Sequence, residues 1–132
     1  IETIFEKKKL LINRQIDSLW PDVTKLMGFE LHHGISSIIQ GEQKRIQPIT
    51  EDPNLGFILK QEGNAIVGGT YLHGIFESGK WRRCWLNQIR MQKGLKPLST
   101  DESNHSVKRE SLINLLADFF EQHIDLYQLL ET

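Results

Sequence analysis

The sequence predicts a small mixed domain of the α/β or α+β class. Runs of β-branched and aromatic residues fill the first half of the chain, and apolar residues at helical spacing fill the second half. The 132 residues suffice for one domain, and 39% hydrophobic with 25% charged residues is an ordinary globular composition. A disordered tail, a collagen and a disulfide scaffold are therefore excluded.

Two extended segments are expected in the first 40 residues. Thr3 to Ile12 begins with β-branched and aromatic residues, and Gly28 to Ile39 has a similar composition. Residues 13–27 are expected to be irregular, with a boundary at Trp20-Pro21, because the residue before a proline is restricted. The polar residues 40–54 predict a loop.

A β-hairpin is expected next. The apolar runs Leu55 to Lys60 and Ala65 to Leu72 flank a four-residue polar turn that contains glycine and asparagine. The second run ends at His73, where the strand gives way to a loop.

The last third of the chain predicts two helices. Apolar residues three and four apart indicate a helix over residues 80–93, ended by Gly94. A polar loop over residues 95–105 follows. A wide apolar stripe then predicts a longer helix from Val107 to about Leu130, with Ser106 as its N-cap.

Charge and composition exclude several partners. Sixteen basic and 17 acidic residues leave a net charge of -1, whereas a nucleic-acid binder usually carries a strongly basic face. No apolar run approaches the roughly 18–20 residues of a membrane span. The single cysteine allows no internal disulfide, which favours a reducing compartment, the cytoplasm.

The five histidines do not predict a metal site. None forms a His-x-x-x-His pair, and the lone cysteine has no Cys-x-x-Cys partner. His32 and His33 are adjacent, so on a strand they point to opposite faces. His73 is different because it ends a strand and is followed by Gly74. A histidine there is suited to act as a general base near neutral pH, although a structural role is the alternative.

Two motifs resemble a known family. Residues 69–76 read Gly-Thr-Tyr-Leu-His-Gly-Ile-Phe and resemble the histidine motif of the cobyric acid synthases. That family belongs to the cobyrinate- and cobyrate-type class I glutamine amidotransferases. Residues 28–34 read Gly-Phe-Glu-Leu-His-His-Gly and resemble the family's Gly-Tyr-Glu-Ile-His-x-Gly motif. Segments 79–87 and 109–118 are similar to the helices that follow, so the resemblance covers most of the chain.

The resemblance implies a fold and a place in a longer protein. Residues 1–132 would be the C-terminal portion of a glutaminase domain with a flavodoxin-like α/β fold. That domain has a mixed sheet with C-terminal helices packed on it. The chain opens without an initiator methionine, inside a predicted strand. We therefore expect a piece of a longer protein, without the nucleophile-bearing half of the domain and without the N-terminal synthetase domain.

The resemblance also implies a reaction. A cysteine attacks the side-chain amide of glutamine, His73 moves the proton, and backbone N–H groups stabilise the oxyanion. The ammonia passes to the synthetase domain, where ATP and Mg²⁺ are expected. There it amidates peripheral carboxylates of adenosylcobyrinic acid a,c-diamide, a step of cobalamin biosynthesis. No cofactor is expected on this chain itself.

Two departures from the family pattern matter. The nucleophile lies on a glycine-flanked elbow in the family, and nothing similar exists here. Cys84 lies within the predicted helix over residues 80–93 and is expected to be a buried helix cysteine, so this chain alone is expected to be inactive. Many relatives in the wider class orient the histidine with a glutamate two residues later, but that position is Ile75. Glu30 and Glu77 are the candidates for an orienting partner.

The Glu30-x-His32 pair has two interpretations. Both side chains share one face of a strand, so they are predicted to form a hydrogen-bonded pair. This pair either lines the site or ties the strand to its neighbour. Two other functions stay open for the chain as a whole. One is a related amidotransferase, such as cobyrinic acid a,c-diamide synthase or the glutaminase of lipid II isoglutaminyl synthase. The other is a non-catalytic binding module on the same fold.

Overall fold

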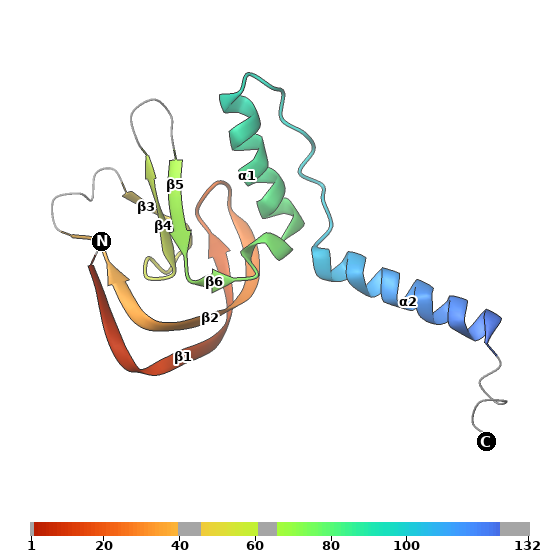
Figure 1. Ribbon diagram of the computed structural model, residues 1–132. Helices are drawn as coiled ribbons and strands as arrows, with labels where there is room; N and C mark the ends of the chain where they lie inside the picture. Colours follow the sequence, from red (N-terminus) through yellow and green to blue (C-terminus); the bar gives the residue numbers. More distant parts are fainter. Residues whose placement is uncertain (1, 40–45, 61–65, 125–132) are drawn as a thin grey trace.

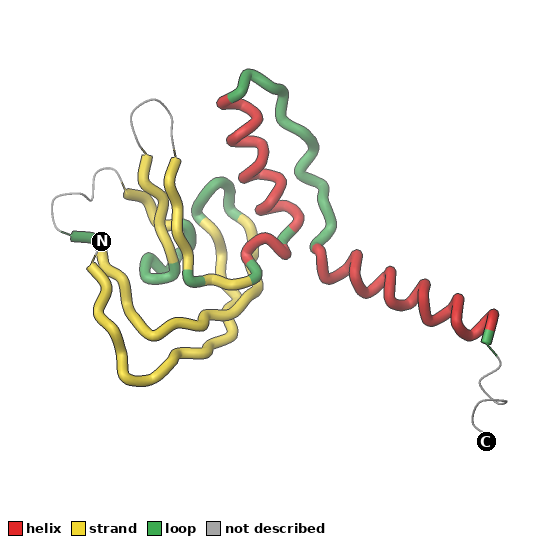
Figure 2. Tube along the Cα trace, viewed as in Figure 1, coloured by secondary structure: helices red, strands yellow, loops and turns green. Residues whose placement is uncertain are grey.

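The computed structural model describes residues 2–39, 46–60 and 66–124 (Figures 1 and 2). Strands fill the first part of the chain and helices the last, as the sequence predicts. The elements in chain order are β1 (Glu2–Ser18), β2 (Thr24–Ser37), β3 (Ile46–Pro48), β4 (Gly56–Lys60), β5 (Ile66–Thr70), β6 (Leu72–His73), the 3₁₀ helix η3 (Ile75–Glu77), α1 (Gly79–Gln92) and α2 (His105–His123).

Two antiparallel sheets form the strand layer. One has the order β1-β2-β6 and the other β3-β4-β5. In Figure 1, β1 and β2 form a long curved hairpin beneath the shorter strands. The mixed α/β composition is confirmed, but the described strands form two antiparallel sheets and not one mixed sheet. The short connections between β1 and β2, β3 and β4, and β4 and β5 favour antiparallel pairing, because parallel strands need a long crossover.

The prediction that residues 13–27 are irregular is wrong. β1 continues to Ser18 and β2 begins at Thr24, so only residues 19–23 form the turn. The Ser18 hydroxyl stabilises this turn, since it donates to the Asp22 carbonyl at 2.6 Å and accepts from the Thr24 amide at 3.0 Å. The boundary predicted at Trp20-Pro21 lies inside this turn.

The second sheet agrees with the predicted hairpin. β4 pairs with β5 from Gly56↔Thr70 to Lys60↔Ile66, while the predicted turn lies outside the described residues. The loop expected over residues 40–54 is wrong at Ile46–Pro48, which form β3 and pair with β4. Three residues next to a partner strand suffice for pairing, even though their own sequence carries no strand pattern.

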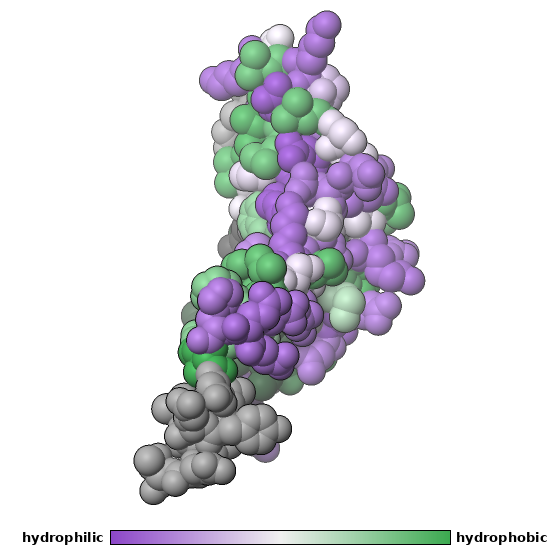
Figure 3. Space-filling view, turned by 90° about the vertical axis from the view of Figure 1, so that its right-hand side faces the viewer, coloured by the Kyte–Doolittle hydropathy of each residue, from purple (hydrophilic) through white to green (hydrophobic). Residues whose placement is uncertain are grey.

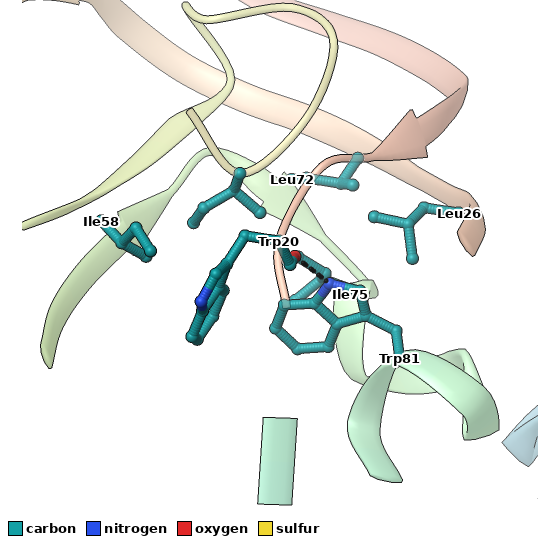
Figure 4. Close-up of a cluster of buried hydrophobic side chains, with 7 residues drawn as sticks. Trp20, Leu26, Ile58, Leu72, Ile75 and Trp81 are labelled. Carbon is teal, nitrogen blue, oxygen red and sulfur yellow. Dashed lines mark hydrogen bonds between the residues drawn. The ribbon is translucent and has the colours of Figure 1, made fainter. Parts of the chain in front are cut away.

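The hydrophobic core joins both sheets to α1. Figure 4 shows its centre, where the indole N–H of Trp81 donates to the carbonyl oxygen of Trp20 at 2.9 Å. The same two rings pack edge to face, with centroids 6.2 Å apart. Each large side chain buried here stabilises the fold by roughly 1.5–3 kcal/mol. The cluster consists of Trp20, Leu26, Ile49, Ile58, Leu72, Ile75 and Trp81.

Helix α1 confirms the prediction for residues 80–93. The Ser78 hydroxyl caps its first turn by accepting from the Trp81 amide at 3.3 Å. Gly94 has φ +70°, the left-handed conformation that ends many helices. The loop that follows runs along α1, where the Asn87 side chain donates to the Leu98 carbonyl and accepts from the Leu98 amide.

Helix α2 differs from the prediction in its cap, its end and its packing. Its N-cap is Asn104 and not Ser106, because the helix begins at His105. The Asn104 side chain does not cap α2 but accepts from the Gly79 amide at 3.0 Å, and so ties α2 to the start of α1. The helix ends at His123, and residues 125–132 lie outside the described part. The expectation that both C-terminal helices pack on the sheet holds for α1 only.

No residue of α2 is buried. Figure 1 shows the helix extending away from the sheets, and Figure 3 shows hydrophobic residues at the molecular surface. Leu112, Leu115 and Phe119 are more than half exposed. Among the described residues, the apolar side of α2 has no surface to cover. No described helix is long and apolar enough to span a membrane.

Candidate active site

His73 lies at the end of β6, where the strand gives way to a turn. Its side chain is exposed. Gly74 follows with φ +85°, a left-handed conformation that glycine adopts without steric cost, and η3 begins at once. The sequence therefore predicted the local setting of His73 correctly.

The chain crosses from one sheet to the other just before His73. β5 ends at Thr70, whose hydroxyl donates to the Leu55 carbonyl at 2.7 Å. The Tyr71 amide donates to the same carbonyl at 2.8 Å. Leu72 is then buried in the core, so the segment that carries His73 is fixed on both sides.

The two family motifs lie side by side. β6 pairs antiparallel with β2, with Phe29 opposite His73 and Glu30 opposite Leu72. The approach is closest at Gly28, where an added Cβ would lie 2.2 Å from the His73 carbonyl oxygen. Only a glycine allows this distance, which explains why the glutamate motif begins with one.

The ring of Phe29 stacks on the imidazole of His73. Their centroids are 5.0 Å apart and the two planes differ by 9°. Residues directly opposite each other on paired strands interact across the sheet, so this contact follows from the register. The sequence pattern did not single out Phe29, because the register of two distant strands is not visible in it.

Glu30 is buried and paired on both carboxylate oxygens. It is 3% exposed. Arg14 Nε donates to one oxygen and His32 Nε2 lies 2.9 Å from the other. Burial alone raises the pKa of Glu30, but hydrogen bonds from His32 and Arg14, together with their charges, leave its pKa below the ordinary value. Arg14 also lies 3.6 Å from Asp52.

His32 forms the hydrogen-bonded pair with Glu30 that the spacing predicts. Its second nitrogen, Nδ1, lies 2.5 Å from the Gly34 carbonyl oxygen. Both ring nitrogens thus lie within hydrogen-bond distance of an oxygen. The ring also stacks on Tyr71, with centroids 4.2 Å apart, and the Tyr71 hydroxyl lies 2.5 Å from that of Ser36. This network joins β1, β2 and the segment before His73.

Neither predicted orienting carboxylate contacts His73 within the described ranges. Glu30 is engaged with Arg14 and His32. Glu77 lies in η3 and forms an exposed ion pair with His105, 3.3 Å away, at the start of α2. The structure brings His73 together with Phe29 and brings Glu30 together with His32, but it does not join the two pairs through a side-chain hydrogen bond.

Cys84 lies on the inner side of α1, as expected. It is 8% exposed, and its sulfur lies 3.9 Å from Asp22 Oδ2. Burial and the negative charge of Asp22 raise the pKa of the thiol. A thiol with a raised pKa is a poor nucleophile at neutral pH.

An apolar cavity of about 480 Å³ opens between β5 and α1. Gly68 faces the core side of β5, since an added Cβ there would lie 3.1 Å from the Ile58 side chain. Trp20, Trp81 and Trp85 line the cavity, and so do Thr70 and Ile75 on either side of the His73 segment. His73 itself does not line it. Within the residues described, no three histidine, cysteine or acidic side chains are grouped to hold a metal ion.

The sequence analysis missed three residues of this site: Arg14, Phe29 and Tyr71. The sequence carries no alternating signal for Arg14, because Leu11 and Ile12 are both apolar and Asn13, Arg14 and Gln15 are all polar. The alternation of half-buried and exposed residues over 11–16 is visible only in the folded strand. Tyr71 stood inside the histidine motif, but its contact with His32 depends on how the two sheets meet.

Comparison with known proteins identifies the class of domain. The profile of the CobB/CobQ-like glutamine amidotransferase domain matches residues 1–81, which contain both motifs. The chain belongs to this family. Its relatives include the cobyric acid synthase of Prochlorococcus marinus (strain MIT 9313), 52% identical over 132 residues, and that of Synechococcus sp. (strain CC9605), 47% identical over 131 residues.

The alignments cover 100% and 99% of this chain but 26% of each relative. The chain therefore spans about a quarter of the length of the curated relatives it matches. No solved structure matches the chain.

Proposed function

We propose that the chain is the C-terminal part of the glutaminase domain of a cobyric acid synthase, and that His73 is its catalytic histidine. One observation carries this proposal: His73 is exposed at the end of β6 and is held directly against the second family motif on β2. The similarity to cobyric acid synthases along the whole chain supports the assignment of the longer protein.

The chemistry requires a cysteine from a part of the domain outside this chain. His73 takes the proton of that thiol, and the thiolate forms a bond to the amide carbon of glutamine. The C–N bond then breaks and the proton leaves with ammonia. Water hydrolyses the remaining thioester to glutamate. His73 suits this role because its exposed side chain leaves room for a thiol within hydrogen-bond reach, about 2.6–3.2 Å.

The ammonia is consumed in a synthetase domain that also lies outside this chain. There, ATP and Mg²⁺ would activate carboxylates of adenosylcobyrinic acid a,c-diamide, and neither group would bind on the residues described above. We further propose that the protein works in the cytoplasm, because the single cysteine of these 132 residues is a buried, unpaired thiol.

The test compares two nitrogen sources in the full-length protein. His73→Asn removes the proton carrier but keeps a side chain of similar size, so glutamine-dependent amidation should fall by a factor of roughly 10² or more. Amidation with ammonium salts at mildly alkaline pH should continue, since it needs no glutaminase. If both rates fall together in a protein that still unfolds cooperatively, His73 is structural and the assignment is wrong. If neither falls, His73 is not the catalytic histidine and the assignment is wrong as well.

A further inference from the structure

We propose that the ring of Phe29 orients the imidazole of His73, in the place where many relatives use a carboxylate. Phe29 is then a positioning residue and not a catalytic one. This inference rests on the proposed function, because it treats His73 as the proton carrier. It gives a role to the aromatic position of the motif over residues 28–34, which is tyrosine in the family pattern.

The geometry of the two rings carries the proposal. Centroids 5.0 Å apart and planes within 9° of parallel describe an offset stack. Such a contact restricts both side-chain torsions of His73, because rotation about either one would lose the overlap. A stacked ring also keeps its edge open. Both imidazole nitrogens, which lie on that edge, stay available to a thiol and to the leaving ammonia.

Phe29 lies in the central strand of the β1-β2-β6 sheet. It lies within β2, with Asn13 of β1 opposite on one side and His73 of β6 on the other. The backbone of His73 is fixed as well, by the close approach to Gly28 and by the burial of Leu72. Gly28 therefore fixes the backbone of His73 and Phe29 fixes its ring, and these two residues are successive in the motif on β2.

The carboxylates near this site have other partners. Successive side chains of a strand point to opposite faces, so Glu30 points away from the face that Phe29 shares with His73. Glu30 binds Arg14 and His32 instead, and Glu77 binds His105. Among the described residues, the His73 side chain stacks on the ring of Phe29 and forms no ion pair with either carboxylate.

Stacking also suits the charge that His73 acquires. Once it has taken the thiol proton, the imidazole is a cation above an aromatic face. A cation within about 6 Å of a ring centroid is attracted by the negative face of the ring. The same contact thus orients the neutral base and stabilises the protonated intermediate.

The experiment uses the full-length protein with three variants. Phe29→Leu removes the ring and keeps an apolar side chain, Phe29→Tyr keeps the ring, and Phe57→Leu is the matched control on β4 of the other sheet. We expect Phe29→Leu to lower the glutamine-dependent kcat roughly 10- to 100-fold, as misplacement of a reacting group does. The KM for glutamine and the ammonia-dependent rate should stay near their wild-type values. Phe29→Tyr and Phe57→Leu should behave like wild type.

Two results would overturn the proposal. The first is a wild-type glutamine-dependent kcat in Phe29→Leu while His73→Asn abolishes this activity, which leaves the proposed function intact and removes the role of Phe29. The second does not depend on any variant folding. In wild-type protein with labelled histidine, the His73 ring protons should show an upfield ring-current displacement, assigned by its absence in His73→Asn. Ring-proton shifts equal to those of an exposed histidine would disprove the stacking.

Discussion

The carbonyl oxygen of His73 lies so close to Gly28 that a side chain at position 28 would overlap it. A Cβ built on Gly28 lies 2.2 Å from this oxygen and 2.9 Å from the Leu72 side chain. The strand that carries the candidate catalytic histidine is thus seated directly on the backbone of the other motif. The pairing of the two motifs therefore requires a residue without a side chain at position 28.

The first prediction follows from this contact. Gly28→Ala should lower the free energy of unfolding of the 132-residue chain by about 1–3 kcal/mol, because overpacking forces β6 away from β2. Urea titration followed by circular dichroism measures it. Gly69→Ala is the control, since its Cβ would meet no atom within 4 Å, and it should change stability by less than about 0.5 kcal/mol. Equal effects of the two substitutions would contradict the close approach.

The second prediction concerns Glu30. Its pKa is lowered in the folded chain by His32 and Arg14, against the effect of burial. The ionised carboxylate therefore contributes stability that is complete above its unfolded pKa and is lost as pH falls through the lower folded pKa. Glu30→Gln should cost about 1–3 kcal/mol at pH 7.

The pH dependence of the stability difference between wild type and Glu30→Gln tests whether the pKa of Glu30 is lowered in the folded chain. The gap in unfolding free energy between wild type and Glu30→Gln should be constant above the ordinary pKa of a glutamate and should narrow as pH falls below it. Glu51→Gln, at an exposed acid, is the control and should leave stability nearly unchanged at every pH. A gap that widens on acidification would mean that the Glu30 network does not stabilise the ionised form.

The third prediction is that the 132-residue chain alone releases no ammonia from glutamine. It carries a candidate base, but its only cysteine is buried with a raised thiol pKa, and the covalent step needs a thiolate. A coupled ammonia assay on the purified chain checks this. Turnover that a thiol alkylating reagent blocks would show that Cys84 reaches the substrate after all.

The fourth prediction concerns Cys84 in the full-length protein. Cys84→Ala removes a small buried side chain, so it should cost about 1 kcal/mol and leave glutamine-dependent amidation near the wild-type rate. Steady-state kinetics and thermal unfolding measure the two quantities. A Cys84→Ala protein that unfolds as cooperatively as wild type but has lost glutaminase activity would identify Cys84 as the nucleophile.

Much of the local structure was present in the sequence. Apolar residues at helical spacing and Gly94 predicted α1, and a strand ending at His73-Gly74 predicted the exposed histidine. The period of two placed Glu30 and His32 on one face. Each of these features depends on residues a few positions apart, whose relative directions follow from backbone geometry alone.

The tertiary structure decided the rest. Arg14 reaches Glu30 because β1 and β2 pair in one register, and Phe29 reaches His73 because β2 and β6 pair in another. Helix α2 projects away from the sheets with no buried residue (Figure 1), whereas its apolar stripe alone predicts a packed helix. The contacts of Arg14 with Glu30 and of Phe29 with His73 join residues 16 and 44 positions apart. Which distant strands pair is set by the packing of the whole core, to which each local pattern contributes only a part.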